Sequence, residues 1–440
     1  MKVMKFGGTS VGKPERMHEV AKLITKDEES KIVVLSALSG TTNALVEISN
    51  SLSQGDRSSA NQQIEALEQH YRNFCEQLLS SPAARQKAET IIQEHFEFLH
   101  IILKISFSEA LNKDILAQGE LLSTKLFSVY LDESGVDHLL IPALEFMTID
   151  NYDEPQIGSI KIKLTQILQR NKDKKIFITQ GYISRNSKGE VDNLKRGGSD
   201  YSASLIGAAI NASVCEIWTD IDGMHNNDPR VVKKTFAIEQ LSFEEAAELA
   251  YFGAKILHPA SIWPAQTYNV PVKLLNTMQP EAKGTLIAAE AGSAGVKAVA
   301  AKDNITAIKI KSSRMLLAYG FLRKIFEVFE KYRTSIDMIT TSEVAVSLTI
   351  DNDTHLQEII KELEPFGTVE VDVNQTIVSI VGNEISETED LMQKLFLALK
   401  NIPVRMVSYG GSRHNVSVLI AGDYKNQTLQ ALNTGLFGLE

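Results

Sequence analysis

The stretches K2-VMKFGGTSVGK-P14 and K31-IVVLSALS-G40 decide the fold. Each opens with a short apolar run, Val3–Phe6 and Ile32–Leu35, and continues into glycine or serine, as buried strands do when they enter tight turns. Between the two runs, residues 14–25 carry apolar side chains at helical spacing behind Pro14, which the first turn of a helix tolerates. The order strand, helix, strand predicts a parallel sheet.

Further strands are predicted along the chain at Ile176–Thr179, Glu216–Thr219 and Val270–Leu275. Each leads into a polar or glycine-bearing loop, and open α/β sheets bind ligands at the carboxyl ends of their strands. From about residue 51 to residue 114 glycine is almost absent and Gln, Glu, Leu and Ile dominate, which predicts two or three long helices.

The last third of the chain contains an internal repeat. Leu322-Arg-Lys-Ile-Phe is echoed seventy positions later by Met392-Gln-Lys-Leu-Phe. Each copy reads strand, helix, strand, turn, strand, helix, which is the pattern of a small ferredoxin-like α+β module. We therefore predict an α/β domain over 1–287 (mainly helical over 51–114), a linker over 288–297, and a tandem pair of modules over 298–440, the first about 305–370 and the second about 371–440, with strands exchanged between them.

The composition of the chain argues against several classes of function. The 440 residues carry 45 Lys plus Arg against 55 Asp plus Glu, a net charge of −10, so no overall basic field argues for nucleic acid. Two cysteines, Cys75 and Cys215, are too few for a disulfide framework, and no C-x-x-C motif argues for zinc. The start of the chain resembles no signal peptide, and no uncharged stretch reaches the length of a membrane span. We expect a cytoplasmic protein.

The first glycine-rich turn partly matches the known phosphate loops. Residues 7–13 match G-x-x-x-x-G-K, but Pro14 stands where a Walker A loop needs Ser or Thr for magnesium. No Gly-x-Gly occurs, which argues against a dinucleotide fold. The Gly7-Gly8 turn with Lys5 nearby suits an anion, although such a turn is also found with no ligand.

Three more clusters have a functional and a plain structural interpretation. Residues 195–203 (KRGGSDYSA) suit an anion at a helix start, or hold only a Ser199 or Asp200 cap. The acidic loop from Thr219 to Arg230 suits a nucleotide or magnesium, or is a surface loop. Residues 252–259 (FGAKILHP) place Lys255 near a helix end. No catalytic triad and no HExxH motif is recognisable.

Together these segments resemble the aspartate kinase (aspartokinase) family. The motifs in order are KFGGTSV at 5–11, VLSA at 34–37 with Thr42, QGELLST at 118–124, RGGSDY at 196–201, the loop from Thr219 to Arg230, and FGAK at 252–255. The tail resembles the tandem ACT domains of monofunctional members. The resemblance covers essentially the whole chain, and KFGGTS combined with RGGSDY is specific to the family.

The resemblance implies an amino-acid kinase sandwich with a mostly parallel central sheet, followed by two ferredoxin-like ACT modules. It implies transfer of the ATP γ-phosphoryl group to the side-chain carboxylate of L-aspartate, which gives 4-phospho-L-aspartate and ADP. This is the first step towards lysine, methionine and threonine. Mg²⁺ is implied as the cofactor, carried by ATP rather than by dedicated protein ligands.

Roles are implied by motif position. The catalytic residues implied are Lys5, Asp200 and Lys255. Those implied for aspartate are Ser36, Thr42, Glu120, Tyr182, Arg196 and Ser199, with Arg196 on a carboxylate and Glu120 on the ammonium group. Those implied for ATP are Lys5, Gly7, Gly8, Thr219, Asp220, His225, Arg230 and Lys255. The family commonly has tyrosine where this chain has His225.

Feedback inhibition, most naturally by lysine, is implied at the first ACT unit. The effector residues implied are Met315, Gly320, Phe321, Leu322, Ser335, Asp337, Thr341, Ser342 and Glu343. The family also implies a homodimer or homotetramer assembled through ACT domains. Two other functions remain open: an amino-acid sensor without catalysis, and a kinase of another amino acid such as glutamate or acetylglutamate.

Overall fold

The computed structural model of the protein describes residues 1–194, 197–253, 257–290, 292–312 and 319–439. It divides into two compact units, one of Met1–Met224 with Leu257–Ala289 and one of His225–Ile256 with Glu290–Glu440. The predicted first domain ran through to residue 287, whereas residues 225–256 group with the second unit. The domain boundaries stay a prediction.

A mostly parallel sheet forms the centre of the first unit, in the strand order β3-β4-β2-β1-β7-β9-β10. The neighbours from β3 to β9 pair in parallel, and β10 runs antiparallel to β9. These strands are β1 (Lys2–Phe6), β2 (Lys31–Leu35), β3 (Leu139–Leu140), β4 (Ile176–Gln180), β7 (Cys215–Thr219), β9 (Val272–Asn276) and β10 (Thr285–Ala288), with a separate hairpin of β5 (Ile183–Arg185) and β6 (Val191–Asn193). The predicted parallel sheet is confirmed.

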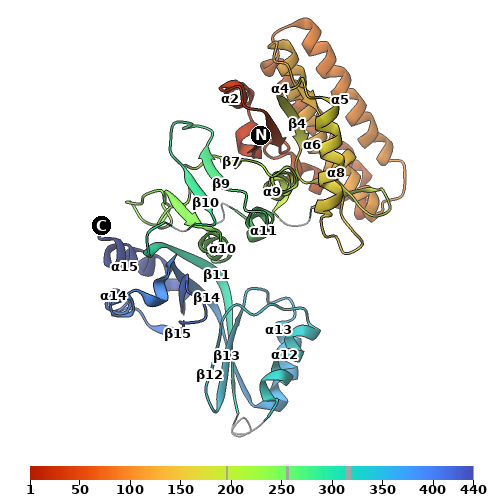
Figure 1. The fold of residues 1–440 in the computed structure, drawn as a ribbon. Coiled ribbons are helices and arrows are strands. Elements are labelled where there is room, and N and C mark those ends of the chain that lie inside the picture. Colours follow the sequence, from red (N-terminus) through yellow and green to blue (C-terminus); the bar gives the residue numbers. More distant parts are fainter. Residues whose placement is uncertain (195–196, 254–256, 291, 313–318, 440) are drawn as a thin grey trace. The chain divides into compact units, whose positions relative to one another are not determined.

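Helices pack onto this sheet, and the long ones run side by side in Figure 1. They are α1 (Gly8–Val11), α2 (Pro14–Thr25), α3 (Thr41–Ser53), α4 (Arg57–Leu78), α5 (Pro82–Ile102), α6 (Glu109–Glu133), α7 (Ala143–Phe146), α8 (Ile157–Arg170), α9 (Gly198–Ile210) and α11 (Pro259–Thr267). Helix α6 contacts β2 and β4, whereas α9 contacts β1, β2 and β7 and packs against α8 and α11. The helices predicted over 14–25 and within 51–114 are confirmed.

The pleat of β1 determines which side chains can reach α9. Met4 and Phe6 are fully buried in the core that the sheet shares with helices α2 to α6. Because successive side chains of a strand point to opposite faces, Lys5 points to the other face. Strand β1 contacts α9 as well, so the Lys5 side chain extends towards that helix.

The second unit is built around a six-stranded sheet in the order β12-β13-β11-β14-β16-β15. Its elements are β8 (Gln240–Ser242), α10 (Phe243–Tyr251), β11 (Gly295–Lys311), α12 (Phe321–Lys331), β12 (Ile339–Thr341), β13 (Ala345–Ile350), α13 (Leu356–Leu363), β14 (Thr368–Asn383), α14 (Leu391–Ala398), β15 (Val404–Ser408), β16 (Asn415–Ala421) and α15 (Lys425–Phe437), with short 3₁₀ turns at Glu364–Phe366, Ile385–Glu387 and Gly422–Tyr424. The predicted repeat is visible in these elements, since α12 and α14 begin seventy residues apart.

Two long strands join the two repeats. Strands β11 and β14 pair antiparallel from Gly295↔Asn383 to Lys311↔Thr368. Along β11, Val299 lies in the core of the second repeat, and Ile308 and Ile310 lie in the core of the first. The two repeats therefore share their central strands. Among the described residues, no helix has the combination of length and apolar character that crossing a bilayer requires.

Candidate active site

The end of β1 brings a lysine and a carboxylate together. The Nζ atom of Lys5 lies 2.5 Å from Oδ1 of Asp200, in the first turn of α9, and the side chains are 11% and 17% exposed. Asp200 reaches this position because Gly197 and Gly198 adopt left-handed φ angles of 68° and 51°, which suit glycine. Gly197 is the N-cap of α9, so neither Ser199 nor Asp200 caps the helix.

The glycine pair after β1 leaves room for this lysine. A Cβ added at Gly7 would lie 3.2 Å from Lys5 Nζ, and one added at Gly8 would lie 3.1 Å from the carbonyl oxygen of Ala37. The N–H of Gly7 donates to the carbonyl of Trp218, 3.3 Å away, so this donor is engaged within the protein. Close approach is therefore the geometric property that the glycines supply here.

A second group of side chains meets at the end of β2. Ser36 Oγ donates to Ser199 Oγ at 2.9 Å, and the carbonyl of Ser36 accepts from Ser123 Oγ on α6 at 2.8 Å. Glu120 lies one turn earlier on α6, and its Oε1 accepts from the N–H of Ala37 at 3.4 Å. The structure thus brings Ser36, Glu120 and Ser199 together. Thr42 lies exposed in the first turn of α3.

Glu120 has unusual electrostatics for a carboxylate. The residue is 4% exposed, and its Oε2 atom has no partner among the described residues. Burial raises its pKa from 4.5 to about 8, while hydrogen bonds from backbone N–H groups oppose the shift only in part. A buried carboxyl oxygen without a partner is rare in folded proteins and suits a cationic ligand.

Tyr182 borders the same region. Its φ of 65° is uncommon for a residue with a side chain, and its backbone is held at both ends, since its N–H donates to Ser202 Oγ at 2.8 Å and its carbonyl accepts from the N–H of Leu194 at 2.7 Å. Burial raises the pKa of its hydroxyl to about 12, with added contributions from Glu120 and Asp192. The tyrosine is therefore a neutral polar group near Glu120.

The predicted nucleotide residues divide between the two units. At the end of β7, Thr219 Oγ1 donates to Asp220 Oδ1 at 3.2 Å, and the carbonyl of Thr219 accepts from the N–H of Thr277. In the second unit, His225 Nδ1 and Thr235 Oγ1 share a hydrogen bond of 2.8 Å. Arg230 is 79% exposed and donates to both oxygens of Asp228, at 2.9 and 2.8 Å.

The predicted effector residues lie around the first repeat. Gly320 has a φ of 78° and forms the N-cap of α12, where Phe321 and Leu322 begin the helix. Besides Gly320, the exposed residues of this set are Ser335 before β12 and Thr341, Ser342 and Glu343 at the turn from β12 to β13.

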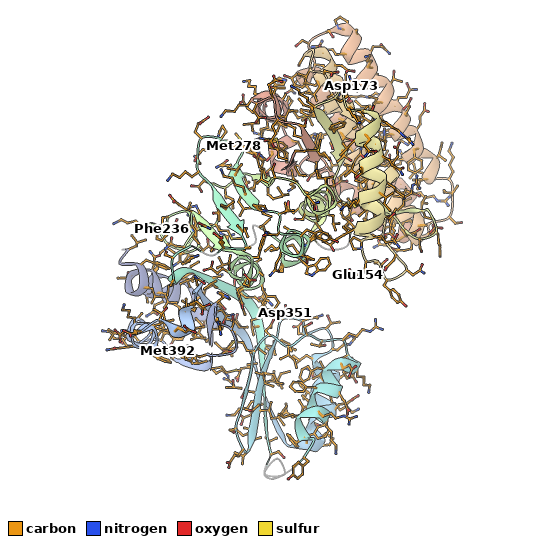
Figure 2. All side chains as sticks on the ribbon, viewed as in Figure 1. Glu154, Asp173, Phe236, Met278, Asp351 and Met392 are labelled. Atoms are coloured by element: carbon orange, nitrogen blue, oxygen red, sulfur yellow. The ribbon has the colours of Figure 1, made fainter. Side chains whose placement is uncertain are left out.

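Asp337 differs from these residues because its side chain is fully buried. Its Oδ1 accepts from the Tyr251 hydroxyl and from Lys302 Nζ, both at 2.7 Å, and its Oδ2 has no partner among the described residues. Lys302 also pairs with Asp351, labelled in Figure 2, at 2.8 Å and lies 4.2 Å above the Tyr251 ring. Although burial opposes it, hydrogen bonding to Asp337 and Asp351 raises the pKa of Lys302.

Three predicted residues, Arg196, Lys255 and Met315, lie outside the described residues. Sequence reasoning missed Tyr251 and Lys302 as partners of Asp337, and it missed the pair of Lys113 and Asp192, whose charged atoms lie 2.6 Å apart. Only the position of Tyr251 immediately before the FGAK motif could have suggested one of them. Within the described part of the chain, no group of three His, Cys, Asp or Glu side chains could hold a metal ion.

Comparison with known proteins gives this fold and site their class. The family model for the amino acid kinase family matches residues 1–276, and an ACT domain model matches residues 378–436. The molecule is thus an amino acid kinase followed by ACT repeats.

Individual relatives of the chain identify its family within this class. The chain is 35% identical to lysine-sensitive aspartokinase 3 of Escherichia coli, over 99% of each chain, and 34% identical to aspartokinase 2 of Arabidopsis thaliana, over 99% of this chain and 84% of that one. The crystal structure of E. coli aspartokinase III in complex with aspartate and ADP matches with a TM-score of 0.85, over 99% of this chain and 100% of that one. The chain belongs to the aspartokinase family.

The burial of Glu120 predicts how the stability of the fold depends on pH. Because its pKa is higher in the folded protein than in the unfolded chain, folding retains a proton that unfolding releases between pH 4.5 and about 8. The free energy of unfolding should therefore fall as pH rises through this window and level off above it. Glu120→Gln removes this slope. Between pH 5 and pH 8 the free energy of unfolding of the variant should therefore rise relative to that of wild type by on the order of 1 kcal/mol or more.

Urea denaturation at pH 5 and pH 8 measures this difference. Glu47→Gln is the matched control, since Glu47 is exposed on α3 and its replacement should leave the slope of wild type unchanged. A Glu120→Gln variant with the same pH dependence as wild type would show that Glu120 is ionised in the folded protein.

Proposed function

We propose that this protein is an aspartate kinase, which transfers the γ-phosphoryl group of ATP to the side-chain carboxylate of L-aspartate and releases 4-phospho-L-aspartate and ADP. It would catalyse the first step towards lysine, methionine and threonine, in the cytoplasm, as a dimer or tetramer. The observation that carries the proposal is the buried Oε2 of Glu120, which has no partner among the described residues and belongs to the group that meets Ser36 and Ser199 at the end of β2. This arrangement suits the ammonium group of an amino acid.

The proposed chemistry needs no general base. A carboxylate acceptor has a pKa near ~4 and is already ionised at neutral pH. The obstacle is the repulsion between an anionic nucleophile and an anionic phosphate, which at ~4 Å and an effective dielectric constant of ~20 is roughly 4 kcal/mol. Among the described residues, Lys5 supplies a positive charge that can offset this repulsion. Arg196 and Lys255 are predicted to assist it. Positioning and charge neutralisation account for most of phosphoryl-transfer catalysis.

Magnesium fits this site as a companion of ATP. Asp200 offers one carboxylate that is already paired with Lys5, which suits an ion held mainly by phosphate oxygens and water. Bound magnesium would neutralise charge on the phosphates. The residues of this chain would then hold Lys5 in place through Asp200 and orient aspartate through Glu120, Ser36 and Ser199.

The test is production of an acyl phosphate. The protein is incubated with Mg-ATP and hydroxylamine, which converts an acyl phosphate to a hydroxamate, in the presence of aspartate, glutamate or N-acetylglutamate. Of the three amino acids, only aspartate should give a hydroxamate. Formation with glutamate or N-acetylglutamate instead would identify another amino acid kinase, and formation with none of them would favour a sensor without catalysis.

Replacement of Lys5 tests its role in the transition state. Lys5→Ala should lower turnover by at least ~100-fold, about 2.7 kcal/mol, because the charge is needed chiefly when the phosphoryl group transfers. Lys13→Ala is the control, since Lys13 is exposed before α2 and should affect turnover less than twofold. Near-normal turnover of a folded Lys5→Ala variant would remove Lys5 from the chemistry.

We also propose that lysine inhibits the enzyme by binding at Asp337. The crystal structure of E. coli aspartokinase III with lysine and aspartate, 34% identical and with a TM-score of 0.80, supports lysine as the effector. Since the Asp337 side chain is fully buried, an effector ammonium group can reach it only if Tyr251 or Lys302 moves. Tyr251 ends α10, four residues before Lys255 in the sequence. Binding of the effector would thereby be communicated to the segment that carries Lys255.

Tyr251→Phe separates binding of lysine from inhibition. The variant loses the donor to Asp337 but keeps the ring, so lysine should bind at least as tightly as to wild type while maximal inhibition falls about fivefold or more. Asp337→Asn should instead weaken lysine binding at least tenfold. Calorimetry and activity assays measure the two quantities, with the exposed Tyr152→Phe as control. Full inhibition of the Tyr251→Phe variant would exclude Tyr251 as the link.

A further inference from the structure

A cluster of three buried asparagines joins the loop after β7 to the last helix of the chain. Asn433 on α15 and Asn226 are 0% exposed, and Asn227 is 3% exposed. Oδ1 of Asn433 accepts from Nδ2 of both Asn226 and Asn227, each at 3.3 Å. Nδ2 of Asn433 donates to the carbonyl of Lys234 at 3.1 Å and to that of Leu439 at 3.4 Å. One carboxamide therefore contacts both ends of the segment 226–234.

The loop itself is closed by further hydrogen bonds. The side chain and backbone of Asn226 pair with the backbone of Phe236, since Oδ1 accepts from its N–H at 2.9 Å and the N–H of Asn226 donates to its carbonyl at 3.1 Å. Asn227 Nδ2 also donates to the carbonyl of Leu429 at 2.9 Å. Phe236, labelled in Figure 2, packs edge to face on Phe437 with ring centroids 5.9 Å apart.

We propose that Asn433 is a positioning residue for the nucleotide, which acts by holding the loop 225–237 through Asn226 and Asn227. The inference rests on the proposed function and on the ATP-binding role that the family resemblance implies for His225 and Arg230 of this loop. Buried carboxamides need their hydrogen bonds, so loss of the Asn433 oxygen leaves Asn226 Nδ2 without its acceptor, leaves Asn227 Nδ2 with the carbonyl of Leu429 alone, and weakens the attachment of the loop to α15. The regulatory repeats thus supply a residue that sets nucleotide affinity.

A double-mutant cycle tests this role. Binding of ADP with Mg²⁺ is measured by calorimetry for wild type, Asn433→Leu, Asn227→Ala and the double variant, and the KM for aspartate is measured beside it. Each single variant should raise the Kd for ADP about tenfold, with the aspartate KM changed less than twofold. The double variant should add little to either single variant, because both remove the same contact. Asn426→Leu, at an exposed asparagine on α15, is the control and should change neither quantity.

The outcomes distinguish the inference from the function on which it rests. An unchanged Kd for ADP in both single variants, or equal losses for ADP and aspartate, would overturn the positioning role and leave the proposed kinase intact. Additive losses in the double variant would overturn the action of Asn433 through Asn227. Wild type that binds no ADP would contradict the proposed kinase itself. If thermal unfolding shows that Asn433→Leu does not fold, Asn227→Ala tests the same contact from the loop.

Discussion

The ion pair of Lys5 and Asp200 is the interaction on which the first unit depends, because it joins the end of the sheet to the first turn of α9. Because successive side chains of β1 point to opposite faces of the sheet, Met4 and Phe6 lie in the core and Lys5 lies on the other face. A partly buried ammonium group needs a counter-charge there, and breaking such a pair from one side is costly. The left-handed glycine turn that precedes α9 supplies it by bringing Asp200 to 2.5 Å. Strand register and helix start therefore have to agree with each other.

Two buried carboxylates in the chain share one property and differ in another. Glu120 and Asp337 each keep one oxygen without a partner among the described residues, so each can gain a cation that the folded chain does not provide. Asp337 is already paired with Lys302, and its response to a ligand is displacement of existing donors. Glu120 has only backbone donors, so burial keeps its pKa near 8 and its response to a ligand includes loss of a proton. The first arrangement suits a regulator, and the second suits a substrate site.

Local patterns in the sequence predicted much of the fold and little of the contact network. Apolar runs and glycines located β1, β2, β4 and β7, since these signals lie within a few residues of each other. The pairs that hold the sites join residues far apart, such as Tyr251 with Asp337 and Asn227 with Asn433. No local periodicity encodes such a pair. Gly197 caps α9, whereas the plain structural interpretation of the sequence offered Ser199 or Asp200, because a glycine in the left-handed region can begin a helix without any side-chain bond.

The loop after β7 shows that residues of one sequence motif can belong to different compact units. By sequence, His225 and Arg230 follow Thr219 and Asp220 in one motif, but the structure groups residues 225–256 with the second unit. Val231 packs against the core of the second repeat, and Asn226 and Asn227 bond to α15. A carboxamide left unpaired there costs about 1–3 kcal/mol, so the loop and α15 are expected to move together. A rearrangement of the second repeat that displaces α15 is therefore expected to displace this loop with it.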